Sequence, residues 1–417
     1  MTILWITNIL FPEAAKLLVG NGEFKASGGW MLGAATALLQ KKDIKLVVAC
    51  VSSLVSNLTK IEGINITYYV LPLGKGNLQV NSDYIPLWKS VHQEVNPDVV
   101  HIYGTEYTHG YAYLKACGGK NVLVSIQGLL SGIYPFYAAG LSIADILSSL
   151  TLRDLIKGNI WFDKYQLKKR SLYERELIKM VNHVTGRTLW DKALVWSLNS
   201  KTTYHFCNEI LRTEFYDNSL WSYHKCVKHS IFLSQGSYPL KGLHQVLKAM
   251  PIVLQYFPDT KIRIAGVDIT KSNTFYSKLR LSGYGLYIKR LIKKLHLDGK
   301  VTFTGNLTAE QMKQEYLQSN VFICPSVIEN SPNSLGEAQI LGVPTIACYA
   351  GGIPDMMKGN EDNLYRFEEY TILAHKINNI FNNKCEHPSM YAVAASRHNI
   401  QVNVDRLYDI YQIVKND

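Results

Sequence analysis

The sequence predicts an α/β protein with two doubly wound domains, each a parallel sheet covered by helices. The chain has 417 residues, whereas a single hydrophobic core usually stops growing at about 250–300 residues. Short β-branched runs alternate with amphipathic stretches along most of the chain, which is typical of parallel sheets flanked by helices. The alternation pauses between residues 207 and 228 and restarts at His229. We therefore expect one domain on each side of that pause.

The expected N-terminal domain covers residues 1–207, a junction covers 208–228, and the C-terminal domain covers 229–396. A last helix, 397–417, follows the second series of strands and is expected to pack back toward the N-terminal domain. The candidate strands are 3–7, 44–50, 64–71, 99–103, 122–126 and 203–206 in the first series, and 231–233, 261–265, 301–304, 321–324 and 345–347 in the second. The amphipathic stretches between them include 30–41, 107–117, 243–256 and 308–318.

The composition is that of a globular chain in a reducing compartment. Hydrophobic residues make up 47% and charged residues 18%, which excludes a disordered, collagen-like or low-complexity protein. The seven cysteines are scattered and form no C-x-x-C pair, which argues against a zinc ribbon or a disulfide framework and favours the cytosol. The apolar first ten residues lack the basic start of a signal peptide, so we expect them to form a buried strand.

The net charge is +11 and is spread over both halves of the chain. Residues 278–300 hold seven basic residues and one acidic residue, and residues 153–192 hold ten basic and five acidic residues. These segments are either ordinary solvated faces or surfaces that attract anionic lipids. Residues 126–152 carry one charge, Asp145, but glycines and a proline interrupt them, so we expect a segment that lies on a membrane rather than one that crosses it.

Two strand–loop–helix units in the second half combine glycines with candidate anion-binding groups. In one, a small-residue loop follows a strand, and Lys241-Gly242 opens the next helix. Ligands of open parallel sheets bind at the carboxyl ends of strands, where helix N-termini attract anions. Lys241 is therefore either a ligand for an anion or a solvated lysine. In the other, a strand ends in Gly351-Gly352, which would let a ligand approach the backbone closely.

A third unit, residues 324–338, places two carboxylates eight residues apart. Glu329 is expected on the loop after a strand, and Glu337 in the first turn of the next helix, where backbone N–H groups are free. Attraction to the helix dipole would by itself explain Glu337, whereas Glu329 has no capping role. Small and polar residues lie between the two carboxylates: Asn330, Ser331, Asn333, Ser334 and Gly336.

The E-x7-E spacing, followed by the Gly-Gly-x-Pro-Asp run, resembles the signature of retaining glycosyltransferases of family 4, the group 1 enzymes. Segments 262–266 and 301–306 fit the same pattern. The resemblance is strong over residues 229–358 and looser before them. Residues 186–191 resemble a form seen in enzymes of bacterial surface-polysaccharide assembly. The fold implied by this resemblance is GT-B, two doubly wound Rossmann-like domains facing a central cleft.

The resemblance implies a nucleoside-diphosphate sugar as donor, bound mostly by the second domain. Lys241 would neutralise the diphosphate leaving group, Glu329 would lie near the sugar ring, and Glu337 would hold the ribose hydroxyls. Lys241 and Glu329 are thus the catalytic candidates, acting by positioning and charge stabilisation. The other donor-binding candidates are Gln235, Gly266, Asn306, Asn330, Ser331, Asn333 and Ser334. The acceptor-side candidates are Gly28, Gly29, His101 and Gln127.

Two positions depart from the family pattern. The family usually has an arginine a few residues before the lysine, where this chain has Gln235 and Gly236, and often a histidine where this chain has Gln127. One positive charge and one titratable group are therefore missing, and Arg187 or Arg263 are candidates to supply the charge. No D-x-D motif is evident, so we expect neither a metal nor a cofactor.

We expect a retaining glycosyltransferase of polysaccharide biosynthesis, such as bacterial lipopolysaccharide or capsule. Its acceptor would be a lipid-linked or other oligosaccharide, and it would lie in the cytoplasm against the anionic inner face of the cell membrane. No nucleic acid partner is expected, because the basic charge comes with no nucleic-acid-binding motif. Two alternatives remain: a catalytically silent homologue that binds a sugar or nucleotide, and a nucleotide-sugar epimerase of the same architecture.

Overall fold

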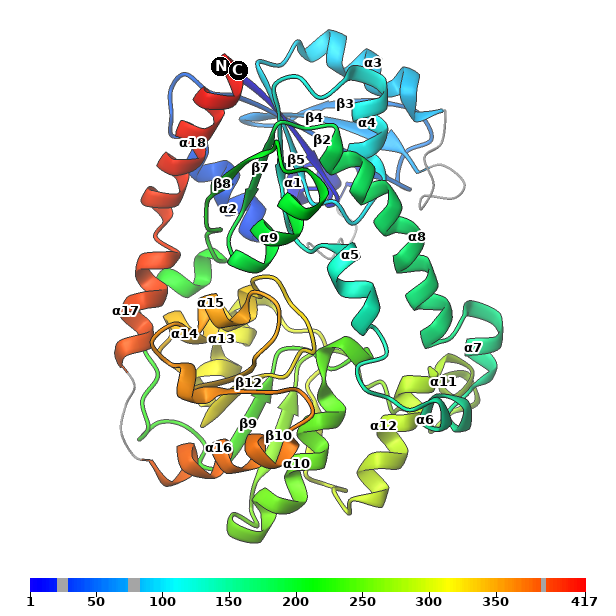
Figure 1. Cartoon of the computed structure of the whole chain (residues 1–417), viewed down its shortest axis with the longest axis vertical. Coiled ribbons are helices and arrows are strands. Elements are labelled where there is room, and N and C mark those ends of the chain that lie inside the picture. The colour runs from blue at the N-terminus through cyan, green and yellow to red at the C-terminus, as the bar shows by residue number, and fades with distance from the viewer. Residues whose placement is uncertain (21–28, 74–82, 384–387) are drawn as a thin grey trace. The chain divides into compact units, whose positions relative to one another are not determined.

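The computed structural model describes residues 1–20, 29–73, 83–383 and 388–417. The chain forms two compact units, each built around its own sheet (Figure 1). Among the described residues, no helix is long and apolar enough to cross a membrane. Unit 1 consists of residues 1–132, 167–213 and 398–417, and unit 2 consists of residues 133–166 and 214–397.

Unit 1 contains an eight-stranded sheet in the order β3-β4-β2-β1-β5-β6-β7-β8. All neighbouring strands are parallel except β3 and β4, which are antiparallel. The strands are β1 (Thr2–Thr7), β2 (Lys45–Ser52), β3 (Thr59–Glu62), β4 (Ile66–Pro72), β5 (Val99–Tyr103), β6 (Val122–Ser125), β7 (His183–Gly186) and β8 (Thr203–Phe206). The helices are α1 (Pro12–Val19), α2 (Gly29–Leu38), α3 (Tyr84–Val95), α4 (His109–Cys117), α5 (Leu130–Ile133), α9 (Leu189–Leu198) and α18 (Ile400–Asn416).

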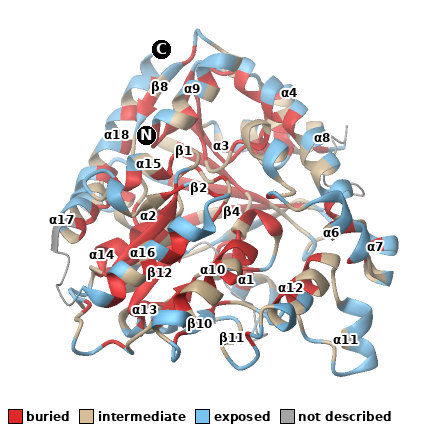
Figure 2. Cartoon of the chain, turned by 60° about the horizontal axis from the view of Figure 1, so that its bottom comes forward, coloured by how far each residue is buried: buried red, intermediate tan, exposed pale blue. Residues whose placement is uncertain are grey.

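The alternation of side chains along β1 explains why this sheet is covered on both faces. Ile3 and Trp5 belong to one hydrophobic cluster, which includes residues of α2 and α18, whereas Leu4 and Ile6 belong to the cluster on the other face. All four side chains are buried, and the strands are red in Figure 2. Because both faces of such a strand are buried, its sequence is a continuous apolar run, as expected for a parallel sheet between helices.

Unit 2 contains a six-stranded, all-parallel sheet in the order β11-β10-β9-β12-β13-β14. The strands are β9 (Ser230–Leu233), β10 (Lys261–Ile264), β11 (Val301–Phe303), β12 (Val321–Cys324), β13 (Thr345–Cys348) and β14 (Leu364–Tyr365). The helices are α6 (Ile143–Ser148), α7 (Leu152–Lys157), α10 (Leu243–Tyr256), α11 (Phe275–Arg280), α12 (Gly283–Lys294), α13 (Ala309–Gln318), α14 (Asn333–Ile340), α15 (Ile353–Met356), α16 (Tyr370–Asn382) and α17 (Pro388–Arg397). Helix α8 (Ile160–Lys179) has residues in both units.

Residues 133–166 belong to unit 2, although the sequence placed them in the N-terminal domain. Ala139 and Ile146 lie in the hydrophobic core of unit 2. The carbonyl oxygen of Ala139 also lies 2.9 Å from Nε2 of the buried His244 on α10. These contacts join segments about a hundred residues apart, so the local sequence pattern could not show them.

The last helix of the chain, expected over 397–417, is α18 (Ile400–Asn416), and a separate helix, α17, precedes it. α17 belongs to unit 2 and α18 to unit 1, and the break falls at His398 and Asn399. The Asn399 side chain accepts a hydrogen bond from the Val402 N–H and so caps α18. Val404, Leu407 and Tyr411 of α18 are buried in the core of unit 1.

Candidate functional site

Three loops of unit 2 meet at the carboxyl ends of β9, β12 and β13, which are adjacent in the sheet. The Val327 N–H donates a hydrogen bond to the Leu240 carbonyl (2.9 Å), which joins the first loop to the second. The Gly352 N–H donates to the Glu329 carbonyl (2.9 Å), which joins the third loop to the second. Sheet order thus brings together three motifs that the sequence shows separately.

Two glycines of these motifs are needed where the loops touch. Gly242 has φ +70°, and a Cβ there would lie 1.9 Å from the Pro325 carbonyl oxygen. Gly351 has φ +56°, and a Cβ there would lie 2.0 Å from the Glu329 carbonyl oxygen. Any side chain at either position would push the loops apart, and the backbone angle is one that glycine adopts most readily.

The two catalytic candidates, Lys241 and Glu329, are in direct contact. The Lys241 ammonium and the Glu329 carboxylate form an ion pair, and each side chain is about one-fifth exposed (20% and 21%). Burial is the largest single effect and lowers the pKa of Lys241, but the Glu329 carboxylate and the neighbouring Tyr238 and Cys324 together raise it by more, so the net pKa lies above its ordinary value. Lys241 therefore carries its charge at neutral pH, and its Nζ also lies 5.6 Å from the centre of the Tyr238 ring.

Helix α14 begins four residues after Glu329. Its N-cap residue, Pro332, makes no side-chain cap to the first turn, so the first backbone N–H groups of the helix have no such partner. Glu337 is buried within the helix, and the Tyr316 hydroxyl lies 3.4 Å from its Oε2 and 3.1 Å from the Ser334 carbonyl oxygen. Tyr316 therefore holds the Glu337 side chain in place, a role that no sequence spacing indicated.

The remaining donor-binding candidates lie around the same edge of the sheet. Asn330 is buried, whereas Ser331, Asn333 and Ser334 are half-buried at the start of α14. Gly266 pairs with Gly305 through two backbone hydrogen bonds of 2.8 and 3.1 Å, which places Asn306 beside the end of β10. Gln235 and Asn306 are exposed, at the ends of β9 and β11.

Neither arginine proposed to replace the missing charge is free for that role. Arg263 points from β10 to Glu315, with Nε and Nη2 lying 2.7 and 2.5 Å from its two carboxylate oxygens. Arg187 belongs to unit 1, where it forms an ion pair with Glu209 and donates to the Ile126 carbonyl (3.0 Å). Both guanidinium groups are thus committed to partners within their own units.

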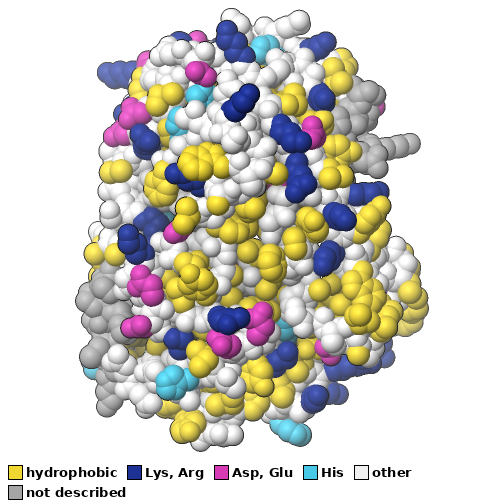
Figure 3. All heavy atoms as spheres, in the orientation of Figure 1, with side chains coloured by type: hydrophobic (Ala, Val, Ile, Leu, Met, Phe, Trp, Pro, Cys, Tyr) yellow, Lys and Arg dark blue, Asp and Glu magenta, His cyan; other side chains and the backbone are white. Residues whose placement is uncertain are grey.

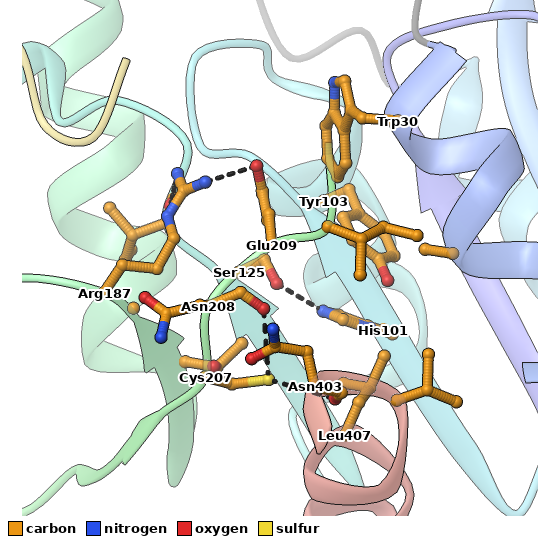
Figure 4. Close-up of a pocket in the computed structure, with 16 residues that line it drawn as sticks. Trp30, His101, Tyr103, Ser125, Arg187, Cys207, Asn208, Glu209, Asn403 and Leu407 are labelled. Atoms are coloured by element: carbon orange, nitrogen blue, oxygen red, sulfur yellow. Dashed lines mark hydrogen bonds and ion pairs between the residues drawn. The ribbon is translucent and has the colours of Figure 1, made fainter. Parts of the chain in front are cut away.

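Unit 1 has a cavity of about 500 Å³, counting its open mouth, at the carboxyl ends of β5, β6 and β7. Figure 4 shows Arg187 and Glu209 paired on one side and Trp30 above Tyr103 on another. Gln127 donates to the Glu209 carboxylate (2.6 Å), so this acceptor-side candidate belongs to the same polar cluster. The labelled lining residues are Trp30, His101, Tyr103, Ser125, Arg187, Cys207, Asn208, Glu209, Asn403 and Leu407.

His101 lines this cavity but has both ring nitrogens engaged. Nδ1 lies 2.6 Å from the Tyr411 hydroxyl, and Nε2 lies 2.6 Å from the Ser125 hydroxyl. Burial lowers its pKa to about 3, so the ring is neutral at physiological pH. His101 therefore orders the cavity wall. Of the other acceptor-side candidates, Gly29 is exposed at the start of α2 and Gly28 lies outside the described residues.

Among the described residues, no group of three or more His, Cys, Asp or Glu side chains is arranged to hold a metal ion. The expectation that no metal or cofactor is used stays a prediction.

The family model "Glycosyl transferases group 1" matches residues 222–398. Those residues are therefore similar to a group 1 glycosyltransferase domain. They include the loops that carry Lys241, Glu329, Glu337 and the glycine pair. A curated relative, sulfoquinovosyl transferase SQD2 from Arabidopsis thaliana, is 33% identical over 86 residues, which are 21% of this chain and 17% of that protein.

Solved structures that match the chain over nearly its whole length establish the GT-B fold. Sucrose-phosphate synthase from Thermosynechococcus elongatus has a TM-score of 0.71 at 14% identity, covering 99% of both chains. An E. coli trehalose-6-phosphate structure bound with UDP-2-fluoro glucose has a TM-score of 0.63 at 10% identity, covering 100% of this chain and 99% of the other. Anabaena HepE in complex with UDP has a TM-score of 0.61 at 13% identity, covering 99% and 100%.

Proposed function

We propose that the protein is a retaining glycosyltransferase that moves a sugar from a nucleoside-diphosphate sugar to a lipid-linked saccharide. The observation that carries the proposal is the meeting of Lys241, Glu329 and the start of α14 at one sheet edge within the group 1 domain. A cation and an uncapped helix N-terminus form a site for a diphosphate. A carboxylate beside them suits the hydroxyls of a sugar.

The proposed reaction exchanges one bond at the anomeric carbon for another on the same face. The bond from that carbon to the phosphate oxygen breaks, and a bond to the acceptor hydroxyl oxygen forms. The acceptor proton passes to the departing phosphate oxygen, which yields the nucleoside diphosphate and a glycoside of retained configuration. Lys241 and the first N–H groups of α14 stabilise the charge on the leaving group, and Glu337 accepts hydrogen bonds from the ribose hydroxyls.

The nature of the donor is the first part of this proposal to test. Two of the similar structures hold UDP or a UDP-sugar analogue, so UDP-sugars come first and GDP-sugars second. A ligand at 100 times its dissociation constant adds about 2.7 kcal/mol of stability, which raises the melting temperature by roughly 5–10 °C for a domain of this size. We expect that shift with one nucleotide class and expect Lys241→Ala and Glu337→Ala to lose it.

Product analysis separates the alternatives. Retention is read from the anomeric configuration of the product by NMR, with a lipid-linked oligosaccharide as acceptor. The missing arginine, replaced by the exposed Gln235, favours a silent homologue as second candidate; it would bind the donor and form no product. An epimerase would convert the donor without any acceptor. The lipid-linked acceptor also implies work at the inner face of the cell membrane, in assembly of a bacterial surface polysaccharide.

A further inference from the structure

Three short helices of unit 2 expose an unusual number of large apolar side chains. α6 and α7, with the first residues of α8, expose aliphatic and aromatic residues, and α11 exposes two aromatic residues and a leucine. Ile156 is 83% exposed, Phe275 is 78% exposed and Leu155 is 74% exposed. We name this surface the α6–α7–α11 face. Its exposed apolar residues are Ile143, Leu147, Leu152, Leu155, Ile156, Trp161, Phe162, Tyr165, Phe275, Tyr276 and Leu279.

The two sequence segments of this face are packed together although more than a hundred residues separate them. Arg290 of α12 donates a hydrogen bond to the Ser148 carbonyl (2.5 Å). Gly283, at the start of α12, lies so close to Asp154 that a Cβ there would be 2.5 Å from its carboxylate. Figure 1 places α6, α7 and α11 next to one another, and Figure 3 shows hydrophobic side chains gathered in that region, with Lys and Arg beside them.

The acidic residues of α6 and α7 are used internally. Asp145 and Asp154 each form a capping box at the start of their helix, with Ser142 and Thr151 respectively. Two basic residues are exposed by contrast: Lys157 at the end of α7 and Lys278 on α11. Residues 271–294 contain seven basic residues and no acidic residue. The face therefore combines exposed apolar side chains with a rim of positive charge.

This combination selects an anionic lipid surface over a second copy of the chain. In a two-fold dimer the same face meets itself, so the cationic rims of the two copies would repel each other. A bilayer with anionic headgroups attracts the rim, while the aromatic and aliphatic side chains enter the headgroup and acyl boundary. The helices are too short to cross a bilayer and expose too much apolar surface for an ordinary solvated face. Figure 2 shows α7 and α11 as largely exposed.

We propose that the α6–α7–α11 face docks unit 2 onto an anionic lipid bilayer. This inference rests on the proposed function, because a lipid-linked acceptor has to be met at a membrane. The inference goes further by naming the surface that makes the contact. That surface is formed jointly by α6 and α7, from the first half of the chain, and by α11 and α12, from the second half.

The experiment is co-sedimentation of the full chain with vesicles of phosphatidylcholine and phosphatidylglycerol in equal parts, and with vesicles of phosphatidylcholine alone. We expect binding to the mixed vesicles, weaker binding to the neutral ones, and weakening by salt. Leu155→Ser combined with Ile156→Ser should abolish binding. The control is Ile64→Ser, because Ile64 is at least as exposed (88%) as Leu155 and Ile156 but lies in unit 1, outside this face.

A charge variant tests whether both segments contribute. Lys157→Gln combined with Lys278→Gln removes one cation from each of the two segments. Each basic residue near the surface strengthens binding to an anionic membrane by about fivefold, so the partition coefficient of the double variant onto the mixed vesicles should fall by about 25-fold. The control, Lys201→Gln with Lys225→Gln, removes two exposed cations elsewhere and should change it little. Melting temperatures of the variants establish that they are folded.

Three results would overturn the inference. In the first, the wild type does not bind to the mixed vesicles. In the second, the Leu155→Ser, Ile156→Ser variant binds them as well as Ile64→Ser does. In the third, the wild type self-associates as its concentration rises and that double variant does not. The nucleotide-sugar melting shift is measured without vesicles and so reports separately on the proposed function. A donor shift without vesicle binding refutes only the docking face, whereas vesicle binding without a donor shift refutes only the transferase assignment.

Discussion

Gly242→Ala is the sharpest test of how the donor loops are assembled. Two independent penalties act at this position. Alanine at φ +70° costs about 1–2 kcal/mol, because its Cβ crowds the backbone in the left-handed region. That Cβ would also lie 1.9 Å from the Pro325 carbonyl oxygen, whereas real Cβ contacts essentially never fall under 3.0 Å. One of the two loops must therefore move by roughly 1 Å.

Forced movement in a packed interior typically costs a further 1–3 kcal/mol, so the total loss should be about 2–5 kcal/mol. The control is Gly299→Ala, because Gly299 has φ +74° and no atom within 4 Å of the added Cβ. That variant should lose only the conformational part, about 1–2 kcal/mol. Both losses can be measured by thermal unfolding of the full chain.

The nucleotide affinity of the same two variants separates local from global damage. A displaced loop should break the Val327–Leu240 hydrogen bond and move Lys241 away from Glu329. Gly242→Ala should therefore lose the nucleotide-sugar melting shift, and Gly299→Ala should keep it. Equal stability loss in the two variants, with the ligand shift intact in both, would show that the approach to Pro325 does not matter.

Further predictions concern single groups. Lys241→Met should reduce transfer by about 10²–10³-fold, the usual cost of losing one group that stabilises the charge on a leaving group. Glu329→Gln should bind the nucleoside diphosphate at least as tightly as the wild type, because Lys241 loses its competing carboxylate. Titration of each variant with the nucleoside diphosphate measures the binding. Tyr316→Phe should cost about 1 kcal/mol in thermal unfolding, because Glu337 loses a hydrogen-bond donor. Burial raises the pKa of Glu106 from 4.5 to about 7, so the folded state holds a proton that the unfolded state releases above 4.5. Stability should fall as pH rises between those values, and Glu106→Gln should flatten that slope in unfolding measured across the range.

The sequence predicted most of the sheet of unit 2, because its strands are short apolar runs bounded by glycine, proline or polar loops. In the sheet of unit 1 it missed β3 and β7. The four residues of β7 include His183 and Thr185 and do not resemble a buried run. These residues are buried because β6 and β8 pair on both sides of them. Position in the sheet, rather than residue type, decides such a strand.

The candidate site was chosen residue by residue and not as an arrangement. Lys241, Glu329 and Gly351 were each chosen from a local motif, and strand order then brought the motifs together. Nothing local indicated the ion pair between two residues 88 apart or the support that Tyr316 gives Glu337. Partners of this kind are set by which helices and strands pack side by side, which a single sequence does not state.

The Lys241–Glu329 pair suggests how the proposed site could hold a diphosphate without the arginine that the family usually has near Gln235. In the pair, the ammonium charge is already balanced by a carboxylate, so a diphosphate must compete with Glu329 for Lys241. Under the proposed function it would do so because it carries more charge than a carboxylate and because α14, which begins four residues after Glu329, has no side-chain cap. Glu329 would then be released toward the sugar hydroxyls, for which a carboxylate is a good acceptor. Donor binding and the placing of Glu329 on the sugar would be one event, so a nucleotide without a sugar should bind less tightly than the nucleotide sugar.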